Sequence, residues 1–249
     1  MRAYALIPAR SGSKGLPDKN IMEIDGIPLL AYSVMFGKAL RIDRVLLSTD
    51  SQKYADIGER FGAECPFLRS AEAASDSAGE HHILADLDAR LPRHGIELPD
   101  VWVWLKPTCP FRSRDAVQQA LRLLENDPSL HSVRIVTEAD ARIHRINEQG
   151  FLEPYFPGLW PPERSKIPRT YLPKAYSPFN LEVFRHEGWK ERGALFMGTR
   201  IKPIVLPRIT GLDIDDRDGA EIIKALIEAR PRPEFVARHL HVDPHGGHG

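Results

Sequence analysis

Short apolar segments alternate with longer amphipathic ones along much of the sequence. The clearest apolar segment, 101–105, reads Val-Trp-Val-Trp-Leu, and its length and lack of charge are typical of a strand buried on both faces. Similar segments occur at 3–7, 44–48, 132–136 and 204–206. Strands joined by helices pair in parallel through right-handed crossovers. The pattern therefore predicts an α/β fold with a doubly wound, mostly parallel, Rossmann-like sheet.

A glycine-rich, cationic loop follows the first predicted strand. Pro8 ends that strand because it has no N–H to donate, and Gly12 and Gly15 allow backbone N–H groups to approach a ligand. Three cations lie within ten positions: Arg10, Lys14 and Lys19. Amides and cations directed at one point suit a polyphosphate. Neither the P-loop spacing nor Gly-x-Gly-x-x-Gly is present, and a basic surface loop is the alternative interpretation.

The loop sequence Ala-Arg-Ser-Gly-Ser-Lys-Gly-Leu-Pro-Asp-Lys-Asn closely resembles the signature of the acylneuraminate cytidylyltransferase family, which activates sialic acid and related sugar acids. The resemblance extends from Tyr4 to about Glu221, and it implies a nucleotidyltransferase sheet that binds CTP. The segment 68–76 resembles a second family motif near the cytosine. The resemblance implies these nucleotide-binding residues: Ala9, Arg10, Ser13, Lys14, Lys19, Asn20, Arg69 and Ala78.

Two aspartates near the C-terminus form the second strong signal. If 212–215 is extended, Asp213 and Asp215 project from one face while Ile214 enters the core. Two carboxylates suit Mg²⁺, whose remaining sites phosphate oxygens can fill. Asp216 is expected to cap the next helix, and the alternative for the whole segment is a solvated loop with that cap. The apolar strand that leads in and the phosphate-suited loop favour a magnesium site, and the resemblance matches Asp213 and Asp215 to the family's magnesium-binding aspartates. This segment and the N-terminal loop are therefore expected to meet at the nucleotide phosphates.

The segment 106–112 resembles the family's Gln-Pro-Thr-Ser-Pro-Leu-Arg loop in the sugar-acid pocket. The resemblance implies four acceptor-binding residues: Lys106, Thr108, Arg169 and Asn180. Lys106 stands where the family has Gln, while Ser177 and Phe179 replace a usual Arg and Asn. Lys106 is therefore expected to pair with an anionic group of the acceptor.

The resemblance implies transfer of CMP from CTP to a sialic acid-like nonulosonate, with release of pyrophosphate. Arg10, Lys19 and Asp215 are expected to carry this step by positioning and by charge neutralisation. The changes on the acceptor side leave two alternatives open. One is a different acid, such as an eight-carbon ulosonate or a phosphonate, and the other is a non-catalytic nucleotide-binding homologue.

Charge and composition indicate small-molecule partners. The 34 basic and 34 acidic residues balance, which gives no footprint for nucleic acid or a membrane surface. The absence of an apolar run of membrane-spanning length and of a leader-like N-terminus favours a cytoplasmic protein. Cys65 and Cys109 are expected to be packing residues in a reducing compartment. A nucleophilic role for Cys109 is the alternative, although no base is identifiable for it.

The whole chain, 1–249, is expected to form a single domain. Residues 137–200 are rich in Pro, Arg and aromatic side chains and are predicted to form an inserted lobe, which the resemblance matches to a dimerisation and acceptor lobe of a homodimer. Residues 231–249 are expected to be a flexible, His-rich tail, with a metal site as the alternative. Asp50 or Ser51 is expected to cap the following helix, and a catalytic carboxylate is the alternative for Asp50. A second capped helix is expected to start near Ser113 or Arg114-Asp115 and to run to Leu124.

Overall fold

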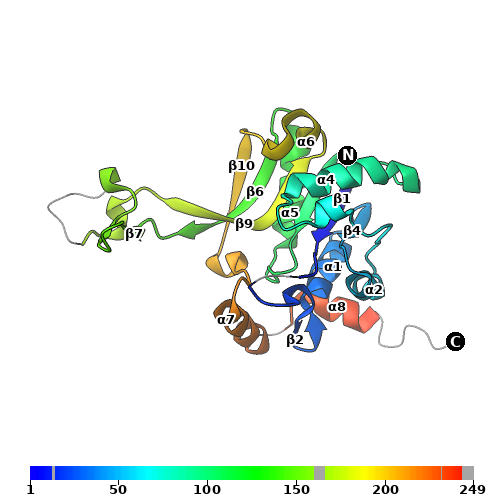
Figure 1. Cartoon of the computed structure of the whole chain (residues 1–249), viewed down its shortest axis with the longest axis horizontal. Coiled ribbons are helices and arrows are strands. Elements are labelled where there is room, and N and C mark those ends of the chain that lie inside the picture. The colour runs from blue at the N-terminus through cyan, green and yellow to red at the C-terminus, as the bar shows by residue number, and fades with distance from the viewer. Residues whose placement is uncertain (13–14, 160–165, 231, 243–249) are drawn as a thin grey trace.

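A six-stranded mixed sheet forms the centre of the computed structural model, which describes residues 1–12, 15–159, 166–230 and 232–242 (Figure 1). Its strand order is β10-β6-β9-β5-β1-β4. The bounds are β1 (Ala3–Pro8), β4 (Arg44–Ser48), β5 (Val101–Leu105), β6 (Ser132–Ala139), β9 (Ala175–Arg185) and β10 (Ile201–Leu206). β9 runs antiparallel to both neighbours, while the other pairs are parallel. The predicted mostly parallel α/β fold is confirmed.

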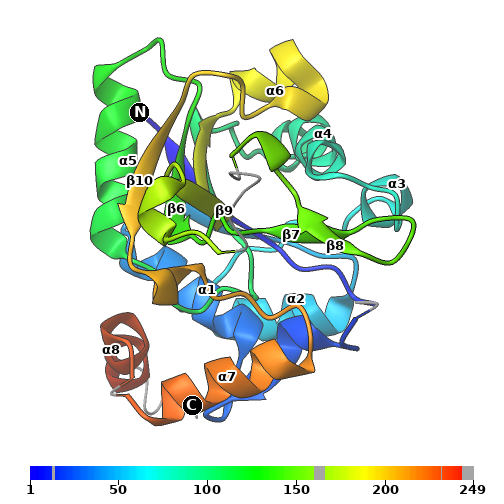
Figure 2. The same cartoon turned by 90° about the vertical axis from the view of Figure 1, so that its left-hand side faces the viewer.

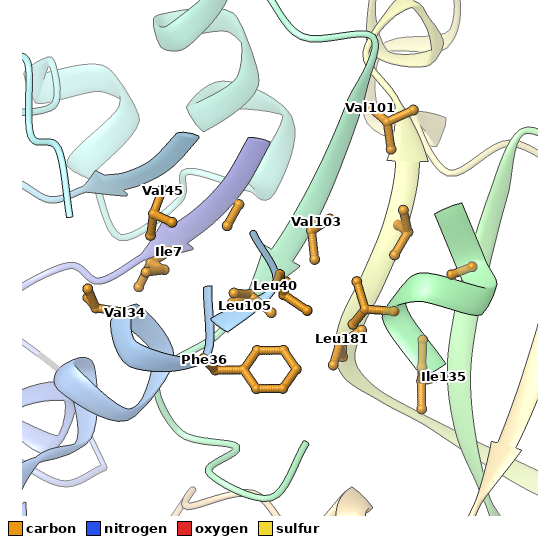
Figure 3. Close-up of a cluster of buried hydrophobic side chains, with 14 of the residues drawn as sticks. Ile7, Val34, Phe36, Leu40, Val45, Val101, Val103, Leu105, Ile135 and Leu181 are labelled. Atoms are coloured by element: carbon orange, nitrogen blue, oxygen red, sulfur yellow. The ribbon is translucent and has the colours of Figure 1, made fainter. Parts of the chain in front are cut away.

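Helices cover both faces of the sheet, so the central strands are buried on both sides. On one face, Val101, Val103 and Leu105 lie in one cluster with side chains of α1 (Figure 3), and the same cluster includes side chains of α2 and α5. On the other face, Trp102 and Trp104 pack mainly against α4. The helix bounds are α1 (Leu29–Ala39), α2 (Gln52–Arg60), α3 (Ala71–Ala74), α4 (Glu80–Arg90), α5 (Arg114–Asn126), α6 (Glu187–Arg192), α7 (Arg217–Glu228) and α8 (Glu234–Val242). Burial on both faces explains why 101–105 is apolar throughout.

Polar side chains begin two of the helices as predicted from the sequence. Ser113 Oγ accepts a hydrogen bond from the Ala116 N–H at 3.2 Å, and Asp216 Oδ1 accepts one from the Gly219 N–H at 2.8 Å. Each bond satisfies an N–H that the first helical turn leaves unpaired. Within the described residues, no helix combines the length and the apolar character needed to cross a bilayer.

An arm projects from the sheet where β6 and β9 continue beyond it. The hairpin of β7 (His144–Ile146) and β8 (Leu152–Pro154) lies at the far end of this arm (Figure 1). The arm contains fewer residues than the predicted lobe of 137–200, because β9 is a strand of the central sheet and α6 packs on the main body. Leu181 and Val183 of β9 are fully buried in the core. This strand was not predicted from the sequence, because it lies within a segment rich in Pro and Arg.

The C-terminal segment differs from the predicted flexible tail. Residues 234–242 form α8, which packs against α1, and the rings of Phe235 and Phe36 lie 5.3 Å apart edge to face. Val236 is fully buried. These apolar side chains give the segment a face that folding removes from water. The remaining residues, 243–249, with His245 and His248 among them, lie outside the described part of the chain. A small antiparallel pair, β2 (Glu23–Ile24) and β3 (Ile27–Pro28), precedes α1.

Candidate active site

A pocket of about 380 Å³ opens at the carboxyl ends of β1 and β5. Ligands of open α/β sheets bind at this edge because the loops that leave parallel strands gather there. Nine of the side chains or backbone positions predicted from the sequence line this one pocket: Arg10, Lys19, Asn20, Arg69, Ala78, Lys106, Thr108, Asp213 and Asp215. Four segments that are far apart in the sequence therefore contribute to a single cavity.

Lys19 joins the N-terminal loop to the acidic segment before α7. Its Nζ donates to the Ile214 carbonyl oxygen at 2.9 Å and lies 3.2 Å from Asp215 Oδ1. The loop also approaches the segment closely at Gly15, where a Cβ atom would lie 3.0 Å from the Asp215 carbonyl oxygen. Ile214 is fully buried, and 212–215 is irregular rather than a strand. The expected convergence of the two motifs is thus present in the structure.

Arg10 lies at the mouth of the pocket. Its backbone carbonyl accepts a hydrogen bond from the buried Asn20 Nδ2 at 3.0 Å, which fixes the course of the loop. Its guanidinium Nη1 donates to Asp76 Oδ1 at 2.7 Å, and both side chains are partly exposed. A cation whose backbone is held and whose side chain faces solvent is available to an incoming phosphate.

Asp50 holds the N-terminal loop instead of capping α2. Its carboxylate accepts hydrogen bonds from the Ser11 N–H at 2.7 Å and from Ser11 Oγ at 2.9 Å. Ser51 occupies the N-cap position of α2, but its side chain makes no capping hydrogen bond. The expectation that Asp50 caps the helix is therefore wrong. Asp50 follows β4, which pairs in parallel with β1, so the segments after both strands lie at the same edge of the sheet. This neighbourhood was the signal that could have placed Asp50 beside the N-terminal loop.

The resemblance implies CTP as a substrate, and Asp50→Ala is expected to raise the KM for CTP about tenfold, or about 1.4 kcal/mol, because the loop loses the two hydrogen bonds that hold Ser11. The acceptor KM should stay unchanged, since the Asp50 carboxylate holds the N-terminal loop through Ser11 and does not line the pocket. Steady-state kinetics with each substrate varied in turn measures both constants. Asp56→Ala is the matched control, because Asp56 is an exposed acid on α2 that contacts Gln52. A rise in both KM values would contradict a loop-specific role.

Arg69 is anchored at the end of β4. Its Nε donates to Ser48 Oγ at 2.7 Å, and its Nη2 donates to the Ser48 carbonyl oxygen at 2.8 Å. Burial lowers the pKa of Arg69 to about 10, so the guanidinium still carries its charge at neutral pH. Ala78 lines the same side of the pocket, in a turn closed by a hydrogen bond from its N–H to the Ser75 carbonyl oxygen at 3.1 Å.

Lys106 follows β5 and faces an acid across the pocket. Its Nζ lies 3.5 Å from Glu80 Oε1, at the start of α4. Its carbonyl oxygen accepts a hydrogen bond from Arg112 Nη2, which fixes the backbone behind it. The Thr108 carbonyl oxygen accepts from the Ile214 N–H at 3.1 Å, so this loop also supports the acidic segment. No sequence pattern identifies Glu80 as a pocket residue, because its contact with Lys106 depends on how α4 packs.

Several predicted residues lie elsewhere. Arg169 pairs with Glu138 on the arm and does not line the pocket. Ala9 is buried, and its N–H donates to the Ser48 carbonyl oxygen at 2.9 Å, so it holds β1 against β4. Ser13 and Lys14 lie outside the described residues, as does the side chain of Asn180. Cys109 is fully buried, as expected for a packing residue.

The acidic pair fits a magnesium ion that a phosphate helps to bind. Asp213 and Asp215 both line the pocket, and one oxygen of Asp213 is shielded from solvent. Within the described residues, no cluster of three or more His, Cys, Asp and Glu side chains could hold a metal by itself. Magnesium commonly takes one or two carboxylates and fills its other sites with water and phosphate oxygens. The donor set is consistent with that pattern.

A family model described as "Cytidylyltransferase" matches residues 4–149, more than half of the chain. The chain belongs to the cytidylyltransferase family. The resemblance found in the loop sequence is thereby confirmed. The matched region contains β1, the N-terminal loop, Arg69 and the Lys106–Arg112 loop, so most of the pocket of this cytidylyltransferase lies within it.

Curated relatives support the same family. The chain is 32% identical over 154 residues to the CMP-N,N'-diacetyllegionaminic acid synthase of Legionella pneumophila, a match that covers 61% of this chain and 66% of that protein. It is 27% identical over 239 residues to the N-acylneuraminate cytidylyltransferase of Escherichia coli, covering 94% and 54%. It is also 27% identical over 241 residues to the pseudaminic acid cytidylyltransferase of Campylobacter jejuni, covering 94% and 100%. The chain thus spans about half the length of the Escherichia coli relative.

Solved structures share the fold of this cytidylyltransferase. The structure of CMP:2-keto-3-deoxy-manno-octonic acid synthetase complexed with CTP matches with a TM-score of 0.66 and 18% identity, over 92% of this chain and 99% of that one. A 4-diphosphocytidyl-2C-methyl-D-erythritol synthase matches with a TM-score of 0.64 and 13% identity, over 91% and 98%. At such identities the likeness establishes the fold.

Proposed function

We propose that this cytidylyltransferase transfers CMP from CTP to a hydroxyl of a nonulosonic acid, an anionic nine-carbon 2-keto sugar acid, and releases pyrophosphate. One observation carries the proposal: Lys19 reaches from the N-terminal loop to Asp215 within a pocket that Arg10 also lines. Cations for phosphates and carboxylates for a metal therefore face one cavity. The names of the curated relatives favour nonulosonic acids as the acceptor class.

The proposed step is a displacement at the α-phosphorus of CTP. The acceptor hydroxyl oxygen bonds to this phosphorus, the bond from phosphorus to the oxygen shared with the β-phosphate breaks, and the hydroxyl proton passes to water. Negative charge grows on the departing pyrophosphate. Arg10 and Lys19 lie where they can offset this charge, and Asp50 keeps the loop in place through Ser11. Catalysis in this proposal is mainly positioning and electrostatic stabilisation.

Magnesium is part of the proposal. Asp213 and Asp215 would hold it, and a bound magnesium ion would neutralise phosphate charge. Lys19 contributes by holding Asp215 and the Ile214 carbonyl group, which keeps the carboxylate beside the phosphate loop.

Lys106→Gln is expected to raise the KM for the acceptor about tenfold and to leave the KM for CTP unchanged, because the ammonium is proposed to meet an anionic group of the acceptor. Glu80, 3.5 Å away, holds the ammonium in the pocket. Substrate-saturation kinetics for both substrates measures the effect. Lys202→Gln removes an exposed lysine on β10 and serves as the control. Equal changes in both KM values would contradict an acceptor-specific role.

A homodimer assembled through the arm is also proposed. The arm, with the adjoining start of β9, exposes large apolar side chains: Ile143, Ile146, Phe151, Leu152, Tyr155, Phe156, Leu159, Tyr171 and Tyr176. Apolar surface of this extent is typical of an interface. A monomeric mass by light scattering would contradict the dimer. A cytoplasmic location completes the proposal, since CTP is an intracellular nucleotide.

Pyrophosphate release tests the function directly. The protein is incubated with magnesium, one of the four ribonucleoside triphosphates and a panel of 2-keto sugar acids and phosphonates. The expected result is release with CTP and a nonulosonic acid only. Turnover with an eight-carbon ulosonate or a phosphonate instead would change the acceptor. No release with any acid would identify a non-catalytic homologue and overturn the proposal.

A further inference from the structure

A second and larger cavity, of about 790 Å³, lies between α1, the start of α5 and α8. Figure 2 shows α8 below the lower end of α5 and beside α1. We call this cavity the α8 groove. Five cationic side chains line it: Lys38, Arg41, Arg112, Arg114 and Arg238. Two acids, Asp115 and Glu234, also line it, so positive charge predominates.

Most of this positive charge is not neutralised within the groove. Arg238 pairs with Glu234 one helical turn away. In the ranges that the structure describes, Lys38, Arg41 and Arg114 form no ion pair with an acidic side chain. The first turn of α5 also faces the groove, and the positive end of the helix dipole lies there. The groove therefore presents a cationic surface whose charge the two lining acids, Asp115 and Glu234, offset only in part.

Arg112 forms the inner wall of the groove and is incompletely hydrogen-bonded. Its Nη2 donates to the Lys106 carbonyl oxygen, but its Nε and Nη1 are shielded from solvent and have no hydrogen-bond partner in the described part of the chain. The guanidinium carbon lies 5.7 Å from the centre of the Phe36 ring. Burial lowers the pKa of Arg112 to about 10, and Asp213 offsets part of that effect. A buried guanidinium with unused donors is costly unless an anion lies nearby.

We propose that the α8 groove binds a phosphate-bearing small molecule. Guanidinium groups match phosphate oxygens in both geometry and charge, and Arg41, Arg112 and Arg114 line the groove together with Lys38. The half-buried Phe235, which packs against Phe36, supplies an apolar surface for the rest of the ligand. The volume falls within the range of ligand pockets, which is about 300–1,000 Å³.

The proposed site is distinct from the active-site pocket, although one side chain links the residues that line the two cavities. The two cavities share no lining residue, and Arg112 connects them because its Nη2 holds the backbone of Lys106. The inference does not depend on the proposed activity, since it rests on the charge and geometry of the groove alone.

Isothermal titration calorimetry with inorganic pyrophosphate, without divalent metal and at about 0.15 M ionic strength, tests the proposal. All proteins carry Lys19→Met, which weakens binding in the active-site pocket. The test variant adds Arg41→Gln and Arg114→Gln. The control variant adds Arg93→Gln and Arg122→Gln, two exposed arginines that do not line either cavity. Net charge is therefore the same in both triple variants.

The expected result is that pyrophosphate binds the control variant with the same Kd as the Lys19→Met protein, and binds the test variant at least tenfold more weakly. Equal Kd values for the test and control variants would overturn the proposal. So would the absence of measurable binding to the Lys19→Met protein. Thermal unfolding of each variant checks that the substitutions leave the fold intact, which is expected because Arg41, Arg93 and Arg122 are exposed and Arg114 is the first residue of α5.

Discussion

Asp215→Asn is expected to lower kcat for CMP transfer by about 10²–10³ at saturating magnesium, because the substitution removes one carboxylate of the proposed magnesium site and keeps the size of the side chain. Asp215 lies 3.2 Å from Lys19 Nζ and lines the pocket together with Asp213. An amide is a weaker magnesium ligand than a carboxylate and leaves Lys19 without its acidic partner. Rates of pyrophosphate release over a range of magnesium concentrations measure the loss.

Asp216→Asn provides a matched control for this prediction. Asp216 is the next residue, and it caps α7 by accepting a hydrogen bond from the Gly219 N–H at 2.8 Å. Asparagine caps helices about as well as aspartate, so this variant should keep its stability and most of its kcat. Near-full turnover of Asp215→Asn in magnesium would refute the assignment of Asp215 to the metal site.

The features that the sequence predicted correctly depend on local patterns. The strand 101–105 was predicted with its observed bounds because a run of five apolar residues has few alternatives in an α/β chain. Ser113 was identified as a cap because capping is decided within four residues. The link between Asp213, Asp215 and the N-terminal loop was predicted from chemistry instead, because a magnesium ion held by two carboxylates is completed by phosphate oxygens.

The features that the sequence did not predict depend on contacts between distant residues. Asp50 accepts a hydrogen bond from Ser11, which lies 39 positions earlier in the sequence. The local pattern that favours a helix cap carries no information about this contact with the N-terminal loop. Glu80 meets Lys106 only because α4 packs on β5. β9 enters the centre of the sheet antiparallel to its neighbours, which the alternation of strands and helices does not predict. α8 forms because α1 offers Phe36 to Phe235. In each case tertiary packing decides the outcome.

Lys19→Met is expected to lower kcat/KM for CTP by about 10²–10³, because it removes a cation that is proposed to bind the phosphates and keeps a side chain of similar length. The Lys19 side chain is only 19% exposed, so its charge acts in a partly dehydrated setting where electrostatic contacts are stronger than in water. The acceptor KM should change little. Lys53→Met is the control, since Lys53 is an exposed lysine whose Nζ lies 3.5 Å from Asp18 Oδ2, beside the same loop.

Magnesium dependence separates the two roles that Lys19 can have. If Lys19 only holds Ile214 and Asp215 in place, its loss weakens metal binding, and a high magnesium concentration should restore the rate of Lys19→Met. If Lys19 contacts the phosphates, as proposed, the deficit should persist at saturating magnesium, because no added ion replaces an ammonium at that position. Recovery of near-normal kcat/KM at high magnesium would therefore remove Lys19 from the phosphate site and leave it as a positioning residue for the carboxylates.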